Sequence, residues 1–197
     1  MANQAGKSYA LNAITPMRAE AAPLLRLIFR AIPLGFYKRQ TEELVALKFI
    51  HYARWVVLPR ADFPHLDAAQ PREALQYDYL LFCSNFNGDW ENYIEAFSEM
   101  IPGGLDNIWR WSLKYPGARP VGPFIDYIRT CQYQTAYYYN AYPGASTRDI
   151  LGALAVTGEY DRFALEADSL TPDEFEHAYV AFLGRVQTEL GGTGPRE

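Results

Sequence analysis

Three histidines are the side chains of this sequence best suited to acid–base chemistry or metal binding near neutral pH. His51 lies in the apolar run LKFIHYARWVVL, His65 in a polar stretch, and His177 in a segment of helical pattern. The histidines and cysteines lack the spacing of a zinc site, and no P-loop or GxSxG motif occurs. We therefore expect no dedicated metal site. His51 remains as a haem ligand, a base, or a neutral hydrogen-bonded core residue.

Arg54 shares the apolar run with His51. A guanidinium in such a strand needs an acceptor, which is either Asp78 on a neighbouring strand or the carboxylate or phosphate of a ligand. His51 and Arg54 are therefore the candidate catalytic residues, in a pocket between sheet and helices. The candidate ligand-binding residues are Tyr52, Asn85, Asn87, Trp109 and Arg110.

The elements that would position these residues are organised around the stretch from Gln76 to Ile101. Apolar residues fall on both sides of the run 77–86, which is typical of a strand covered on both faces. A helical pattern follows, with apolar residues at 90, 94, 97 and 101. Asp89 is a good N-cap for that helix, and Gly88 allows a positive φ at the corner.

The rest of the chain supplies further strands and helices. We expect strands over 9–14, 47–58 and 129–141, with the strands at 47–58 and 77–86 as antiparallel neighbours. Thr15 and Pro16 predict the start of a helix, and Pro23 predicts a kink or a restart within it. Ser146 or Thr147 caps one C-terminal helix, and Thr171 to Glu174 form the capping box of another.

This order of elements predicts an α+β fold: a ferredoxin-like βαββαβ antiparallel sheet with helices packed on it, followed by extra C-terminal helices. We expect a single domain over 1–197, with a core at 9–141 and a helical extension at 146–190. The two central strands are apolar on both faces, so one layer of helices would leave an apolar face exposed. The C-terminal helices or a second copy must cover it, and we favour a homodimer formed through the sheet.

The element order over residues 9–141 resembles the dimeric α+β barrel group, which includes the dye-decolourising peroxidases and chlorite dismutases. The segments HYARWVVL and LLFCSNFNGDWENYIEAF look like parts of uncharacterised bacterial proteins of this group. The run from Phe86 to Asp89 is similar to the Gly-Phe-x-Asp-Gly stretch of the dye-decolourising peroxidases, with Asn87 where their Asp precedes Gly. The resemblance implies a haem cofactor.

Charge and composition narrow the partners. The net charge of −5 argues against nucleic acid, although residues 1–60 carry +6 and the remainder −11. Cys83 and Cys131 lie in apolar patterns and are expected as free buried thiols. We see no secretory signal and no apolar run of about 20 residues, so we expect a cytoplasmic protein. The basic and apolar segment 17–37 packs in the core, lies on an anionic membrane surface, or meets a partner protein.

Three functions of different classes remain. The first is a homodimeric ligand-binding or interaction module. The second is a haem-dependent or cofactor-free oxidoreductase that uses His51 and Arg54. The third is a peripheral membrane protein that uses the helix at 17–37.

Overall fold

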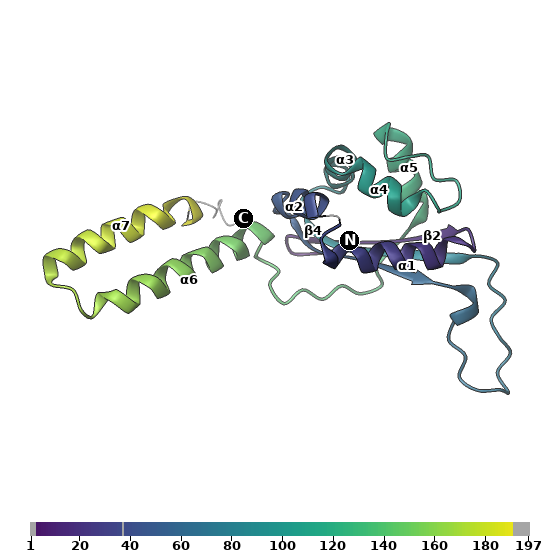
Figure 1. Cartoon of the computed structure of the whole chain (residues 1–197), viewed down its shortest axis with the longest axis horizontal. Helices are drawn as coiled ribbons and strands as arrows, with labels where there is room; N and C mark the ends of the chain where they lie inside the picture. Colours follow the sequence, from purple (N-terminus) through teal and green to yellow (C-terminus); the bar gives the residue numbers. More distant parts are fainter. Residues whose placement is uncertain (1–2, 37, 191–197) are drawn as a thin grey trace. The chain divides into compact units, whose positions relative to one another are not determined.

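The computed structural model describes residues 3–36 and 38–190, and its internal contacts divide the chain into two units. The first unit is Met1–Pro143 and the second is Gly144–Glu197. Figure 1 labels their helices and the strands β2 and β4. Each unit is described by itself below.

An antiparallel sheet forms the centre of the first unit. Its strands are β1 (Gln4–Ala5), β2 (Ser8–Met17), β3 (Ile50–Leu58), β4 (Asp78–Asn87) and β5 (Gln132–Tyr133). They follow the order β1-β2-β4-β3, and β5 also pairs with β2. β2 lies along the whole of β4, from Ser8 opposite Asn87 to Met17 opposite Asp78. The expected antiparallel pairing of the 47–58 and 77–86 strands is confirmed, because β3 pairs with β4.

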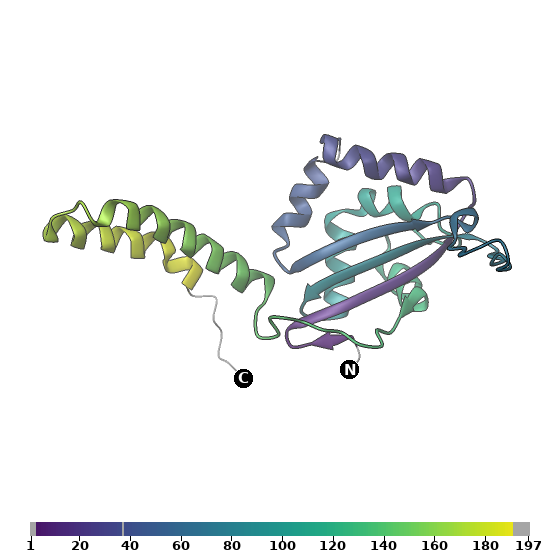
Figure 2. The same cartoon turned by 90° about the horizontal axis from the view of Figure 1, so that it is seen from below.

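The helices of the first unit leave one side of this sheet without a helical cover. They are α1 (Ala21–Ala31), α2 (Lys38–Ala46), α3 (Trp90–Met100), α4 (Pro102–Trp109) and α5 (Val121–Cys131), with the 3-10 turns η1 (Ile32–Leu34) and η2 (Arg60–Asp62). Helices α3, α4 and α5 lie on one side of the sheet (Figure 1), and α1 lies beside β3. Figure 2 shows the other side, over which no helix of the described first unit lies. The expected class, α+β with an antiparallel sheet and helices, is confirmed.

The core lies between the sheet and the helices α3–α5. Strand residues that point to this side alternate with outward-facing ones, as the pleat requires. The Phe86 ring stacks on Tyr93 of α3 with their centroids 3.7 Å apart, and Phe82 meets Trp109 of α4 edge-on at 5.2 Å. Phe124 and Ile128 of α5 are also fully buried. These aromatic contacts fix the helices on the sheet.

The corner between β4 and α3 forms as the sequence predicts. The Asp89 carboxylate accepts from the backbone N–H groups of Glu91 and Asn92, at 2.8 and 3.2 Å, and so caps α3. Gly88 has φ +97°, a left-handed conformation that a side chain would disfavour. The strand, the corner and the helix of this stretch are therefore all confirmed.

The helix predicted to start at Thr15 and Pro16 was wrong, because both residues lie in β2. Thr15 is fully buried, and the strand continues to Met17 while it pairs with β4. Pro16 is tolerated because its backbone faces the outer edge of β2, where its carbonyl accepts from Leu113 N–H at 2.8 Å. The helix begins at Ala21 instead. Pro23 sits in its first turn, where no N–H is needed, and α1 continues past it.

The strand predicted over 129–141 was also wrong. Helix α5 continues to Cys131, strand β5 has only two residues, and the chain from 134 to 142 is irregular. Hydrogen bonds from side chains, instead of backbone pairing between strands, fix this segment. Asn3 Oδ1 accepts from the Thr135 N–H at 2.6 Å, and Asn12 Nδ2 donates to Thr135 Oγ1 at 2.8 Å. The alternation of tyrosines in this segment therefore did not mark a strand.

The second unit is a hairpin of two helices, α6 (Thr147–Ala167) and α7 (Pro172–Leu190). The predicted cap of α6 is confirmed at Ser146, which forms a capping box with Asp149. Before α7, the Glu174 carboxylate accepts from the backbone N–H and the hydroxyl of Thr171, which is the side-chain-to-N-cap half of the predicted capping box. Phe163 of α6 packs against rings of α7. Gly152 of α6 lies against α7, where an added Cβ would make a tight contact of 3.2 Å with the Glu189 carbonyl oxygen.

Candidate functional site

The uncovered side of the sheet, called the open face below, carries Tyr52, Arg54 and Asn85 of the residues that we singled out from the sequence. It consists of Ala10, Asn12, Ile14 and Pro16 on β2, Tyr79, Leu81, Cys83 and Asn85 on β4, and Tyr52, Arg54, Val56 and Leu58 on β3. Tyr52 is 69% exposed and Val56 38% exposed. The open face is thus an apolar and aromatic surface that lies partly in solvent.

The segment 134–142 crosses one end of the open face. Asn85 Nδ2 donates to the Tyr138 hydroxyl at 2.8 Å, and Asn140 Nδ2 donates to Ser8 Oγ at 3.2 Å. Tyr137 and Tyr139 remain exposed. The segment therefore covers the end near Ser8 and leaves the part around Val56 and Tyr79 open.

His51 lies at the covered end, inside a small polar cluster. It occupies a bulge of β3, and its Nε2 lies 3.2 Å from Ser8 Oγ. Burial lowers the pKa of His51, while a hydrogen bond with the Asn87 side chain opposes this shift. Asn87 Nδ2 in turn donates to the Lys7 carbonyl at 2.8 Å. The cluster joins β2, β3, β4 and the crossing segment, and it holds a neutral imidazole.

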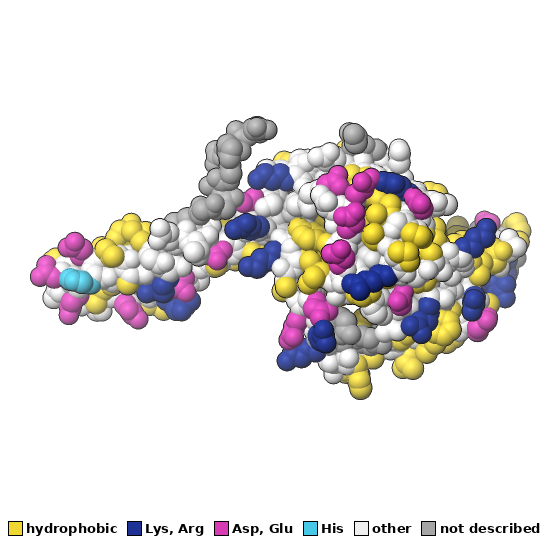
Figure 3. Space-filling view, turned by 90° about the horizontal axis from the view of Figure 1, so that it is seen from above, with side chains coloured by type: hydrophobic (Ala, Val, Ile, Leu, Met, Phe, Trp, Pro, Cys, Tyr) yellow, Lys and Arg dark blue, Asp and Glu magenta, His cyan; other side chains and the backbone are white. Residues whose placement is uncertain are grey.

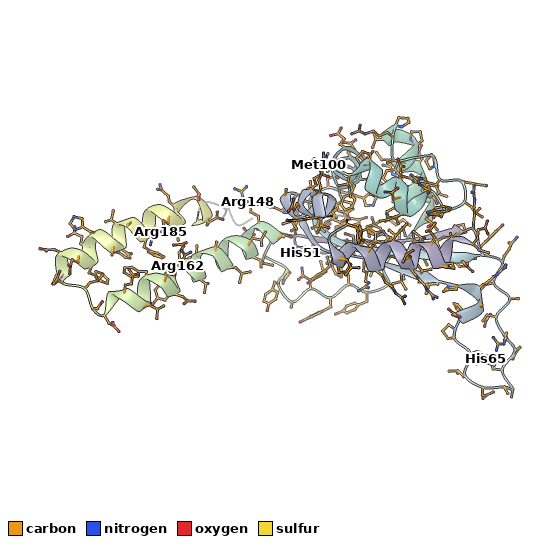
Figure 4. All side chains as sticks on the ribbon, in the orientation of Figure 1. His51, His65, Met100, Arg148, Arg162 and Arg185 are labelled. Atoms are coloured by element: carbon orange, nitrogen blue, oxygen red, sulfur yellow. The ribbon has the colours of Figure 1, made fainter. Side chains whose placement is uncertain are left out.

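These surroundings do not fit the haem ligand that the resemblance implies. The imidazole hydrogen-bonds with both Ser8 and Asn87, and Ser8 is almost fully buried. An iron atom at His51 Nε2 would have to displace the Ser8 hydroxyl. The cluster instead has the features of a structural, hydrogen-bonded histidine. His65 lies far from it, in the long loop before β4 (Figure 4).

The other candidates separate into two groups. Arg54 is exposed on the open face, and Asp78 accepts from the Arg60 backbone N–H at 2.9 Å. Trp109 is only 1% exposed and belongs to the core on the opposite side of the sheet. Arg110 is exposed and donates to the Asp106 carbonyl of its own helix at 3.0 Å. The fold therefore brings His51 and Asn87 together, places Asn85 opposite Tyr52, and keeps Trp109 and Arg110 apart from them.

A cavity of about 640 Å³ lies at the outer edge of β2, beside α5. We call it the α5 cavity. Its walls include Ile14 of β2, Leu113 and Lys114 of the turn after α4, and Tyr127, Thr130 and Cys131 of α5. Neither α5 nor this turn was among the predicted site residues. Tyr127 and Cys131 are four residues apart on α5 and so share one face of it. The strand predicted from Arg129 onward placed them in different elements, which is why this pair was missed.

Two polar groups of the α5 cavity, the Tyr127 hydroxyl and the Cys131 thiol, stay neutral near pH 7. Burial raises the pKa of the Tyr127 hydroxyl, which donates to the Leu113 carbonyl at 3.4 Å. Burial also raises the pKa of the Cys131 thiol, which is half-buried and free. Lys114 and Asp126 carry opposite charges, and both are exposed. The walls otherwise consist largely of prolines, aliphatic side chains and tyrosine rings.

The basic segment 17–37 forms the end of β2, α1 and η1 where it is described, and Tyr37 lies outside the described residues. Leu25 of α1 is buried in the core, whereas Leu27, Leu34 and Phe36 are exposed. Lipid binding through these residues stays a prediction. Within the described part of the chain, no helix is both long and apolar enough to cross a bilayer. Nor do the described residues bring three His, Cys, Asp or Glu side chains together as a metal site would require.

Comparisons with protein-family models, curated proteins and solved structures gave no match for this chain. The similarity to dye-decolourising peroxidases and chlorite dismutases therefore stays a prediction. Function has to be argued from the open face and the α5 cavity themselves.

Proposed function

We propose that this protein is an interaction module that assembles as a homodimer through the open face of its sheet. The observation that carries this proposal is the exposure of apolar side chains, Tyr52 and Val56 among them, on a face without helical cover from the described first unit. Burying apolar surface contributes about 25 cal/mol per Å². Covering this face would therefore favour association.

The charges on the open face favour a second copy over nucleic acid or lipid. Among the residues that define the face, Arg54 alone carries a formal charge. Binding to phosphates needs a cluster of basic side chains, which this face does not offer. Aromatic residues with few charges, such as Tyr52 and Tyr79, are typical of the centre of a protein–protein interface.

The size of the face agrees with a dimer of moderate strength. Three strands spaced about 4.8 Å apart and about 30 Å long give roughly 400 Å² in projection, and side chains make the real surface larger. A standard interface takes about 800 Å² from each partner. The projected area of one open face is roughly half of that share, so the proposed dimer lies at the small end of specific interfaces.

We further infer the ferredoxin-like arrangement for the sheet. Its support is the pairing of β5 with β2, opposite Asn12 and Ala13, which makes β5, β2, β4 and β3 successive neighbours. Two βαβ halves would then interleave in one antiparallel sheet. A pair of such sheets, packed face to face, is the assembly we propose.

A charge placed on the open face tests the proposal. We expect the wild-type protein to sediment as a dimer at micromolar concentrations. Val56→Lys puts an ammonium group into the interface, where its desolvation opposes association, and should give a monomer. Sedimentation velocity across a concentration series measures this change.

Val45→Lys is the matched control, since Val45 is 70% exposed on α2, away from the open face. This variant should remain dimeric. Circular dichroism checks that both variants are folded. A wild-type monomer at every concentration, or a folded Val56→Lys variant that remains a dimer, would refute the proposed interface.

A further inference from the structure

We propose that the α5 cavity binds a small, neutral, largely aromatic molecule. Cavities that hold such ligands measure about 300–1,000 Å³, and this one measures about 640 Å³. The proposal does not rest on the homodimer, because the cavity is lined mainly by α5 and the turn after α4. Of the open-face residues it includes Ile14 and Pro16.

The cavity occupies a gap along the outer edge of β2. β5 pairs with this edge at Asn12 and Ala13, and the segment 111–113 pairs with it again from Pro16 to Arg18. Ile14 lies between these two pairings. The backbone of Pro16 faces the outer edge, so the backbone of Ile14, two residues earlier, faces it too. A ligand in the cavity would therefore meet peptide groups as well as side chains.

The lining determines the chemical class. Proline, leucine and isoleucine carbons and three tyrosine rings, of Tyr77, Tyr127 and Tyr133, form most of the wall. Aromatic rings pack well against such surfaces. The Tyr127 hydroxyl and the Cys131 thiol supply half-buried polar contacts, and both are neutral near pH 7. The opposite charges of Lys114 and Asp126 give no net preference for an ion.

N-phenyl-1-naphthylamine is a suitable probe because it is neutral and aromatic and becomes fluorescent in apolar surroundings. We expect a saturable fluorescence increase with one site per chain. Its sulfonated relative, 1-anilinonaphthalene-8-sulfonate, should bind more weakly, because the sulfonate would have to lose water inside an apolar cavity. Tighter binding of the sulfonate would overturn the neutral class that we propose.

Thr130→Trp fills the cavity from α5, and Thr157→Trp is its matched control. Both threonines are exposed helical residues whose Oγ1 donates to the carbonyl four residues earlier, at 2.8 and 2.9 Å. Thr130→Trp should weaken probe binding by roughly tenfold or more, whereas Thr157→Trp should leave it unchanged. Equal affinity in the two variants, or no saturable binding to the wild type, would overturn the proposal.

Cys131 gives a second readout at the site itself. Bound probe should slow the labelling of this thiol by N-ethylmaleimide, as mapped by mass spectrometry, with Cys83 as an internal reference. If saturating probe leaves the labelling rate of Cys131 unchanged, binding in this cavity is contradicted. The same measurement on Val56→Lys separates the two proposals, because we expect probe binding to persist there even where association is lost.

Discussion

At the scale of single residues, His51 shows how three strands build one polar cluster. Its imidazole meets Ser8 of β2 and Asn87 of β4, and Asn140 of the crossing segment reaches the same Ser8 hydroxyl. Burial disfavours the imidazolium, so the pKa of His51 is lowered in the folded protein. The cluster therefore favours a neutral histidine and fastens the crossing segment to the sheet.

This lowered pKa predicts a dependence of stability on pH. Near pH 6.5 the folded state binds fewer protons at His51 than the unfolded state, so the contribution of His51 is intact above about pH 6.5 and is lost as the pH falls below it. When the pH is lowered from 7.5 to 5.5, the melting temperature of His51→Gln should therefore fall by less than that of the wild type. Thermal unfolding followed by circular dichroism measures this difference.

His65→Gln is the control for this prediction, because His65 lies in the loop before β4, where its Nε2 is 2.6 Å from the Gln70 carbonyl. It should keep the pH dependence of the wild type. If His51→Gln and the wild type lose equal stability on acidification, the neutral His51 described above is wrong.

The residues of the site were only partly predictable. A histidine in an apolar strand predicted either a ligand or a hydrogen-bonded core residue, and the structure favours the second. Its partners Ser8 and Asn87 follow from strand register, which a sequence pattern does not give. Tyr127 and Cys131 were missed because the apolar, tyrosine-rich run after Ile128 predicts a strand, whereas the helix continues through it.

At the scale of elements, the unit of β4, its corner and α3 was predictable because every local signal agrees. The strand alternates, Gly88 takes the positive φ, and Asp89 caps the helix. The failures lie elsewhere. Thr15 and Pro16 locally favour the start of a helix, but the long pairing of β2 with β4 outweighs this local preference. Asparagine side chains, whose partners are distant in sequence, fix the segment 134–142.

The cap of α3 gives a prediction at this scale. Asp89→Ala removes the acceptor of two backbone N–H groups and should lower the free energy of unfolding by about 1 kcal/mol. Chemical denaturation by urea measures the change, and Asp89→Asn should recover most of it.

Asp67→Ala serves as its control. Asp67 accepts from the N–H groups of Ala69 and Gln70 in the same way, but it does so in an exposed loop that begins no helix. Its loss should change stability by less than that of Asp89. Equal effects would mean that capping of α3 contributes nothing specific.

At the scale of the whole molecule, β3 and β4 are apolar on both faces, which predicts that something packs against each face of the sheet. In the described first unit, helices pack against one face only. Helices α3, α4 and α5 pack on that side. Figure 3, from above, shows hydrophobic side chains among charged ones of both signs over the first unit. The open face differs from that mixed surface, since Arg54 alone is charged there, and this difference is why we propose self-association through it.

The class of fold could be predicted because the periodicity of apolar residues separates strands from helices. The way in which the open face is covered could not be predicted, because a sequence pattern shows that a surface is apolar and not what lies against it. The same limit holds for the α5 cavity, which forms between residues more than a hundred positions apart, such as Ile14 and Thr130.

The most direct measurement is photocrosslinking from the open face itself. A benzoylphenylalanine side chain in place of Tyr52 should yield a covalent dimer, with the crosslinked peptide from β2, β3 or β4 of the second copy. The same side chain in place of Leu66, which is 88% exposed in the loop before β4, should yield none. A crosslink from position 52 into helices α3–α5, or no dimeric product at all, would contradict the proposed assembly.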